Sequence, residues 1–87
     1  MGTKPAAKVK EAAAGSLETI AYASVSAIPT VEPNDRNRLG YHVWRWLLSK
    51  QGTIEETVKE SGSRLSINSA EAANIISESL KKQGAIQ

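Results

Sequence analysis

Few side chains in this sequence have the types and spacing that catalysis or metal binding would need. His42 is the only histidine and cysteine is absent, so a metal site would lack the further His, Cys or clustered acidic ligands that it requires. Serine is common, but no Gly-x-Ser-x-Gly turn or separate base is present to activate a nucleophile. No glycine-rich phosphate loop occurs either. The sequence therefore predicts a non-enzymatic protein without a metal or cofactor.

The remaining candidates are cations that could face an anion. At helical spacing Arg38, His42 and Arg45 lie on one side of a helix expected around residues 39–51. Such a stripe is equally consistent with a solvated surface and with an anion-binding one. Eleven Lys and Arg against nine Asp and Glu give a net charge of +2, which is well short of the basic excess of a strong nucleic-acid binder.

These cations must be positioned by the segment 39–51, LGYHVWRWLLSKQ, which holds both tryptophans and the densest apolar cluster. At about 100° per residue its apolar side chains cover about 220° of the helix, whereas a helix half in water needs little more than about 100°. We therefore expect it to be covered on two sides. Trp44 and Trp46 point in different directions, so we expect one in the core and one in an interface. The residues assigned to an interface with a second copy or another protein are Tyr41, Trp44 and Leu48.

The chain divides into an N-terminal part, residues 1–33, and a helical domain, residues 34–87. Residues 1–10 carry three lysines and no acid, which is typical of a basic arm. Helix formers dominate residues 6–24 and predict a weakly amphipathic helix, with a strand over residues 19–28 as the alternative. Two prolines then mark a linker before the second part.

In the second part the sequence predicts three helices joined by turns. Asn34 or Asp35 is expected to cap the central helix, and Gly52 to end it in a left-handed conformation. The residues Thr-Ile-Glu-Glu at 53–56 form a capping box for a short second helix, and Asn68 caps the third. The inward residues expected on the second and third helices are Ile54, Val58, Ala72, Ala73, Ile76 and Leu80.

The order of these features over residues 39–86 resembles the winged-helix branch of helix-turn-helix proteins. A long apolar helix leads through a Gly-Thr link into a short helix, TIEETVKESG, then a turn with inward Leu and Ile, then a third helix ending in SESLKKQGAI. That ending is similar to the entry into the first strand of a wing, here at Ala85-Ile86. The turn is longer than the three or four residues of a tight helix-turn-helix, and the wing is expected to be absent or truncated. The expected fold class is mainly α, a three-helix core of winged-helix type with an extra N-terminal helix or arm.

The resemblance implies a DNA-binding module, such as a transcription, replication or partition factor, with its third helix in the major groove of double-stranded DNA. Asn74 could pair with an adenine edge, and Ser77 and Lys81 could reach bases or phosphates. Glu71 and Glu78 lie on the same surface and oppose the approach of a polyanion. The expected nucleic-acid contacts are Arg64, Ser69, Asn74, Ser77, Lys81, Arg38 and Arg45.

The alternative is a non-catalytic protein–protein interaction domain, or a small subunit of an assembly, with a winged-helix-like or three-helix fold. The small net charge, the acids on the third helix and the wide apolar arc favour this alternative. No apolar run approaches the roughly 18 residues that a membrane span needs, and cysteine is absent. These features predict a cytoplasmic protein without a membrane segment.

Overall fold

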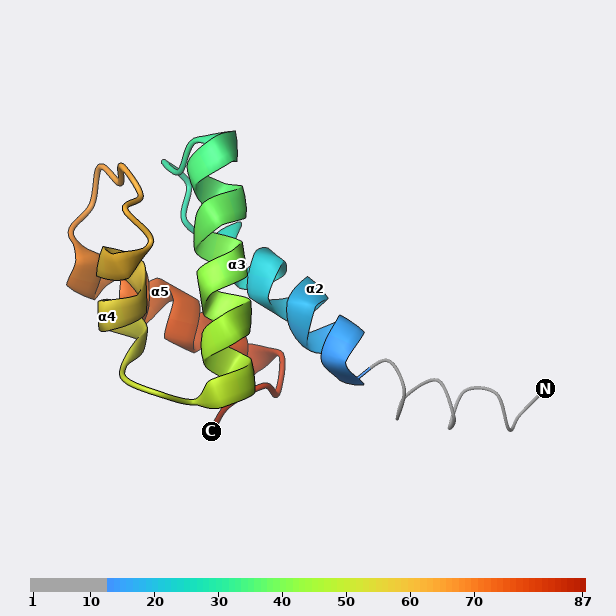
Figure 1. Ribbon diagram of the computed structural model, residues 1–87. Coiled ribbons are helices and arrows are strands. Elements are labelled where there is room, and N and C mark those ends of the chain that lie inside the picture. The colour runs from blue at the N-terminus through green and yellow to red at the C-terminus, as the bar shows by residue number, and fades with distance from the viewer. Residues whose placement is uncertain (1–12) are drawn as a thin grey trace, which may run out of the picture.

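The computed structural model describes the backbone of residues 13–87 and the side chains from Leu17 onward. Within that range the chain forms helices and no strand (Figure 1), which confirms the mainly α class. The basic arm and the start of the first predicted helix lie outside the described residues. The helices are α2 (Ala13–Val25), α3 (Pro33–Ser49), α4 (Ile54–Glu60) and α5 (Ser69–Lys82).

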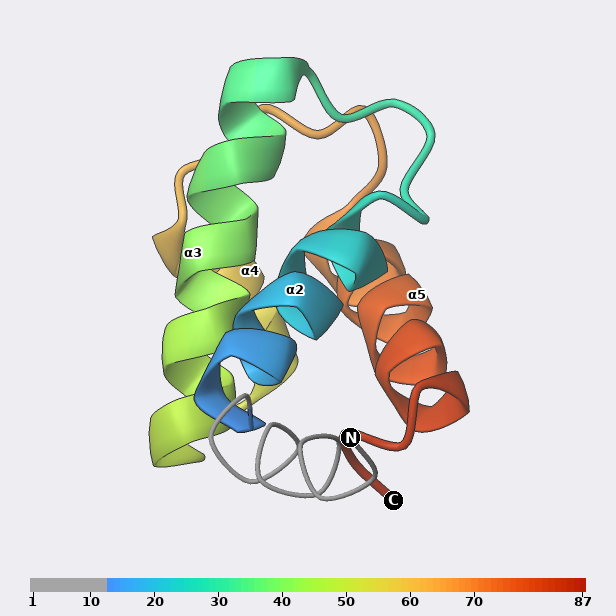
Figure 2. The same ribbon diagram turned by 90° about the vertical axis from the view of Figure 1, so that its right-hand side faces the viewer.

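α3 and α5 lie on opposite sides of the bundle, and α2 and α4 each contact both of them. Figure 2 shows α2 crossing between α3 and α5 on the near side, with α4 behind. α3 is thus covered on two sides, as its sequence predicts, but Tyr41 and Leu48 at the edge of its apolar arc stay exposed. The outward faces of α3 and α5 consequently point away from each other.

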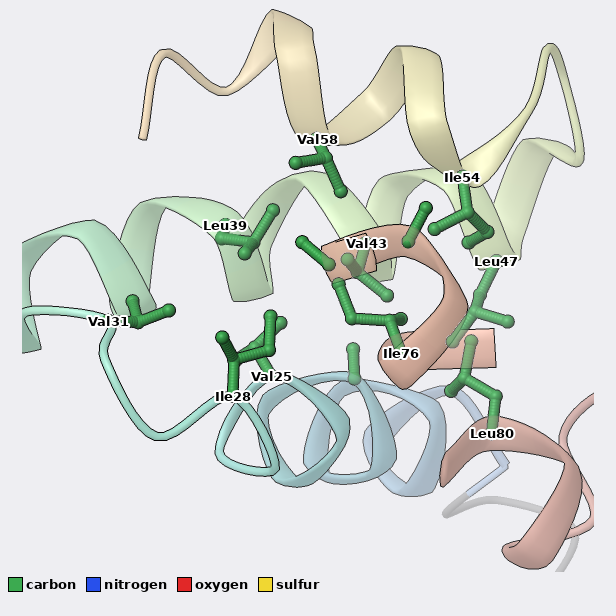
Figure 3. Packing of buried hydrophobic residues seen from close by; sticks show 13 residues of the cluster. Val25, Ile28, Val31, Leu39, Val43, Leu47, Ile54, Val58, Ile76 and Leu80 are labelled. Atoms are coloured by element: carbon green, nitrogen blue, oxygen red, sulfur yellow. The ribbon is translucent and has the colours of Figure 1, made fainter. Parts of the chain in front are cut away.

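A single hydrophobic core joins the four helices. Leu39, Val43 and Leu47 lie one turn apart on α3 and point into it, as do Ile76 and Leu80 from α5 (Figure 3). The inward residues predicted on α4 and α5 are all buried, which confirms the register of both helices. The buried members of the cluster are Ala21, Val25, Ile28, Val31, Leu39, Val43, Leu47, Ile54, Val58, Ala72, Ala73, Ile76 and Leu80.

α2 packs closely on α3 because Gly40 has no side chain. A Cβ atom at this position would overlap the ring of Tyr22, which lies directly on the α3 backbone. Ser24, also on α2, is fully buried, and its hydroxyl donates to the carbonyl of Ala21 at 2.7 Å. The helical prediction for this segment is confirmed within the described residues, and the strand alternative over 19–28 is wrong.

The start of α3 differs from the sequence-based prediction. The helix begins at Pro33, where the missing N–H costs nothing because the first helical residue has no intrahelical acceptor. Its N-cap, Glu32, makes no side-chain cap bond. Neither Asn34 nor Asp35 is the cap, because both lie inside the first turn. The Asp35 side chain instead turns inward and is buried.

The end of α3 also differs, whereas the caps of the next two helices follow the sequence. Lys50, at φ 55°, provides the left-handed residue after Ser49, and Gly52, at φ 75°, comes later in the link. The Thr53 amide donates to Glu56 Oε1 at 2.9 Å and the Glu56 amide donates to Thr53 Oγ1 at 3.1 Å, which is a complete capping box. Asn68 Oδ1 accepts the amide three residues later at 2.7 Å.

The end of α5 does not lead into a strand. Gly84 is left-handed at φ 76°, and the amide of Ala85 donates back to the carbonyl of Leu80 at 2.9 Å. Ala85 and Ile86 pack half-buried against the core. The strand predicted to begin at Ala85-Ile86 is therefore absent from the described residues.

Candidate nucleic-acid interface

The loop between α4 and α5, residues 61–68, is fixed to the start of α3 by Asp35. This residue is only 4% exposed. Its Oδ2 accepts the backbone N–H of Arg64 at 3.1 Å, and its Oδ1 lies 3.6 Å from Arg38 Nη1. The same Arg38 nitrogen donates to the carbonyl of Gly62 at 3.4 Å. Because a buried carboxylate is costly without such partners, these contacts hold the loop and α3 in one arrangement.

Serine hydroxyls fill the beginning of this loop. Ser61 Oγ donates to the carbonyl of Val58 at 2.7 Å and lies 2.8 Å from Ser63 Oγ. Further along, Leu65 and Ile67 pack against the core, as predicted. The connection is longer than a tight helix-turn-helix turn, but hydrogen bonds of Ser61 and Ser63 and the packing of Leu65 and Ile67 hold it in place.

α5 buries one side in the core and presents polar side chains on the other. With about 100° between successive residues, Asn74, Ser77 and Lys81 fall within about 60° of each other. Asn74 and Lys81 are exposed and Ser77 is half-buried. Ser69 is half-buried at the first residue of the helix and is rotated toward the core side. Three of the four predicted α5 contacts therefore share one stripe, which we call the α5 stripe (Asn74, Ser77 and Lys81).

Acidic side chains border the α5 stripe, as the sequence predicts. Glu71 and Glu78 are both exposed. Lys81 Nζ lies 3.7 Å from Glu78 Oε2, and the two side chains are 49% and 63% exposed. Ion pairs this exposed contribute little, since water screens them. Lys81 is therefore free to leave Glu78 for a stronger anionic partner.

The predicted cations do not all belong to one surface. Arg38 and Arg64 meet around Asp35, where α3 joins the loop that precedes α5. Arg45 lies farther along the outward face of α3, where its Nη1 donates to the Tyr41 hydroxyl at 3.0 Å. Since α3 and α5 lie across the core from each other, Arg45 and the α5 stripe face opposite directions.

The three residues predicted for an interface, Tyr41, Trp44 and Leu48, lie with Arg45 on a second surface. We call these four residues the α3 strip. Tyr41 and Leu48 are 43% and 50% exposed and are the exposed large apolar side chains among residues 17–87. Trp44 is half-buried, with its ring 5.9 Å from that of Tyr41. The side-chain spacing of three and four residues places all of them on one side of the helix.

Trp46 points to the other side of α3, toward α4. Its Nε1 donates to the carbonyl of Gly52 at 3.1 Å, and Lys50 Nζ lies 5.1 Å from its ring centroid. Trp46, like Trp44, is half-buried at the margin of the core. The expectation of one tryptophan inside the core is therefore wrong, because Leu39, Val43 and Leu47 fill the centre.

Sequence reasoning did not find the groove between α3 and α4, which has a volume of about 540 Å³. His42 and Arg45 line one wall, while Glu56 and Glu60 line the other. The polar stripe of α3 was visible in the sequence, but the acids opposite it depend on how α4 packs. Within the described residues no group of three or more His, Cys, Asp or Glu side chains could hold a metal ion.

None of the helices in the described part of the chain has the length and apolar character to cross a bilayer. No family model, curated protein or solved structure matches this chain.

Proposed function

We propose that this protein binds double-stranded DNA without catalysing a reaction, and that α5 enters the major groove. The observation that carries the proposal is the α5 stripe, which lies on a helix whose opposite side is firmly packed in the core. α5 has 14 residues and is therefore about 21 Å long. The B-DNA major groove, about 12 Å wide, admits a helix of this kind.

Each residue of this surface has a distinct part in the proposed complex. Asn74 forms paired hydrogen bonds with an adenine edge, and Ser77 donates to a neighbouring base. Lys81 leaves Glu78 and pairs with a phosphate. Arg64 reaches a phosphate from the loop, whose position is set by the bond between its amide and Asp35. Phosphate contacts of this sort orient the helix, while the base contacts select the sequence.

The acids beside the α5 stripe limit the strength of binding. Glu71 and Glu78 repel the phosphate backbone, which otherwise supplies much of the affinity of a DNA-binding protein. With few cations available, the complex should be modest in affinity and should weaken as salt rises. We therefore expect sequence preference to depend mainly on Asn74 and Ser77.

A titration of the full chain with a fluorescent random duplex at about 50 and 200 mM salt tests the proposal. Binding should be measurable at the lower salt concentration and much weaker at the higher one. Arg64→Ala should lower the affinity. It should also reduce the slope of log Kd against the logarithm of the salt concentration by about 1, which corresponds to the loss of one phosphate contact. Arg45→Ala removes the same side chain from the opposite face of the molecule and should leave both quantities unchanged.

Two results would contradict the proposal. One is the absence of binding at low salt, and the other is an equal loss of affinity in Arg64→Ala and Arg45→Ala. The second result would mean that DNA is attracted by total charge and not by the surface around α5.

A further inference from the structure

The α3 strip combines exposed apolar surface with a cation that is held in place. Arg45 donates to the Tyr41 hydroxyl at 3.0 Å, and its guanidinium carbon lies 5.9 Å from the centroid of the same ring. Leu48 is half-exposed one turn farther on. Aromatic and arginine side chains in this combination are enriched in protein interfaces.

The charge of this face is one-sided. The sequence of α3 contains three arginines and a single acid, Asp35, which is buried and already paired with Arg38. Arg36 donates to the carbonyl of Val31 and Arg38 is held by Asp35 and Gly62. Arg45 is therefore the charged residue of the strip, and no exposed acid of α3 lies beside it. Glu56 and Glu60 line the opposite wall of the groove that Tyr41 and Arg45 also line, so these acids border one edge of the strip and do not belong to it.

A second copy of this chain is a poor occupant for the strip. Two α3 helices packed face to face would bring the Arg45 side chains of both copies together with no exposed α3 acid between them, and such like charges repel.

We infer that the α3 strip binds an acidic amphipathic helix of another protein. The apolar side chains of that helix, spaced three or four residues apart, pack against Tyr41, Trp44 and Leu48, in the manner of other helices that bind apolar surfaces. A carboxylate of that helix pairs with Arg45. This inference is independent of DNA binding, since it uses the opposite face of the molecule.

Two synthetic helical peptides with identical apolar positions test the inference, one with Glu and one with Lys at all flanking positions. Each is labelled and titrated with the full chain by fluorescence anisotropy at low salt. The Glu peptide should bind at least about tenfold more tightly than the Lys peptide. Equal binding of the two peptides, or no binding of the Glu peptide, overturns the inference.

Variants locate the binding surface. Leu48→Glu and Arg45→Glu should each weaken binding of the Glu peptide by about tenfold or more, because both add an acid to the strip. Lys59→Glu makes the same change in charge as Arg45→Glu on the exposed side of α4, and should change binding little. An equal loss in Lys59→Glu would show that only the net charge matters, which overturns the assignment to α3.

Light scattering of the chain without peptide tests whether a second copy of the chain covers the α3 strip instead. The inference expects a monomer at concentrations up to about 100 μM, since the like charges on α3 oppose pairing. A dimer that Leu48→Glu dissociates would show that a second copy covers the strip, and would overturn the proposal. Circular dichroism of each variant confirms that a loss of binding does not come from unfolding.

Discussion

The outward faces of α5 and α3 belong to the same bundle but differ in chemistry. The α5 stripe is polar, with an amide, a hydroxyl and one lysine, and acids border it. The α3 strip is apolar and cationic, and the single acid of its helix is buried. A net charge of +2 describes neither face. The comparison shows that the distribution of charge, and not its sum, indicates what each surface could bind.

The two faces share one support. α2 and α4 each contact both α3 and α5, and the core lies between all four. Substitutions in the core should therefore affect both faces, whereas substitutions on one surface should spare the other. This difference sets the order of the following tests.

The largest effect is expected from Ile76→Ala, which removes a fully buried side chain at the centre of the core. The lost apolar contacts and the resulting cavity should lower the free energy of unfolding by about 2–5 kcal/mol. Urea denaturation followed by circular dichroism measures this value. Ile75→Ala, at the half-buried neighbouring position, should cost clearly less; equal losses would place the centre of the core elsewhere.

A smaller loss of stability is expected from Asp35→Ala, which should act mainly on the loop that precedes α5. The change leaves the amide of Arg64 without its acceptor, and an unsatisfied buried donor costs about 1–3 kcal/mol. The thermal unfolding temperature and the affinity for duplex DNA should both fall. Asp35→Asn keeps an oxygen for that amide and should recover part of the loss. If Asn is no better than Ala, the hydrogen bond does not fix the loop.

Thr53→Ala should have a smaller effect, lowering the free energy of unfolding by about 1 kcal/mol. The alanine cannot accept the Glu56 amide, so one half of the capping box is lost. Thermal unfolding measures the change, and Thr53→Ser, which retains the acceptor, serves as the control. A neutral Thr53→Ala would imply that packing of Ile54 and Val58 alone determines where α4 begins.

The smallest changes in stability should come from the surfaces themselves. Lys81→Ala and Tyr41→Ala should each alter the free energy of unfolding by no more than about 0.5 kcal/mol, since both side chains are exposed. Their functional effects should differ: Lys81→Ala weakens duplex binding and spares the acidic peptide, while Tyr41→Ala does the opposite. Loss of both activities in either variant would mean that the two faces are not separate.

Much of the C-terminal part of the fold could be predicted from the sequence because its signals are local. The hydrogen bonds of the capping box at Thr53 and the cap at Asn68 join residues three apart. The inward positions of α4 and α5 follow from helical spacing alone. Such short-range patterns do not depend on knowing where the other helices lie.

The features that the sequence predicts wrongly depend on contacts between residues far apart in the chain. Asp35 is of a residue type that is common at helix caps, but its partner Arg64 is 29 residues away. Likewise, the division of the predicted cations between two faces follows from α3 and α5 lying across the core. The sequence contains both helices and all of these cations, yet their relative positions arise only from the tertiary packing.

The contact between α2 and α5 has a consequence for how the protein is made. These helices are the first and last in the described chain, and they lie side by side in the bundle. α2 leaves the ribosome before α5, so the side of α2 that packs on α5 stays uncovered until α5 has also emerged. During that interval the nascent chain exposes apolar surface, and chains in such a state are prone to aggregate.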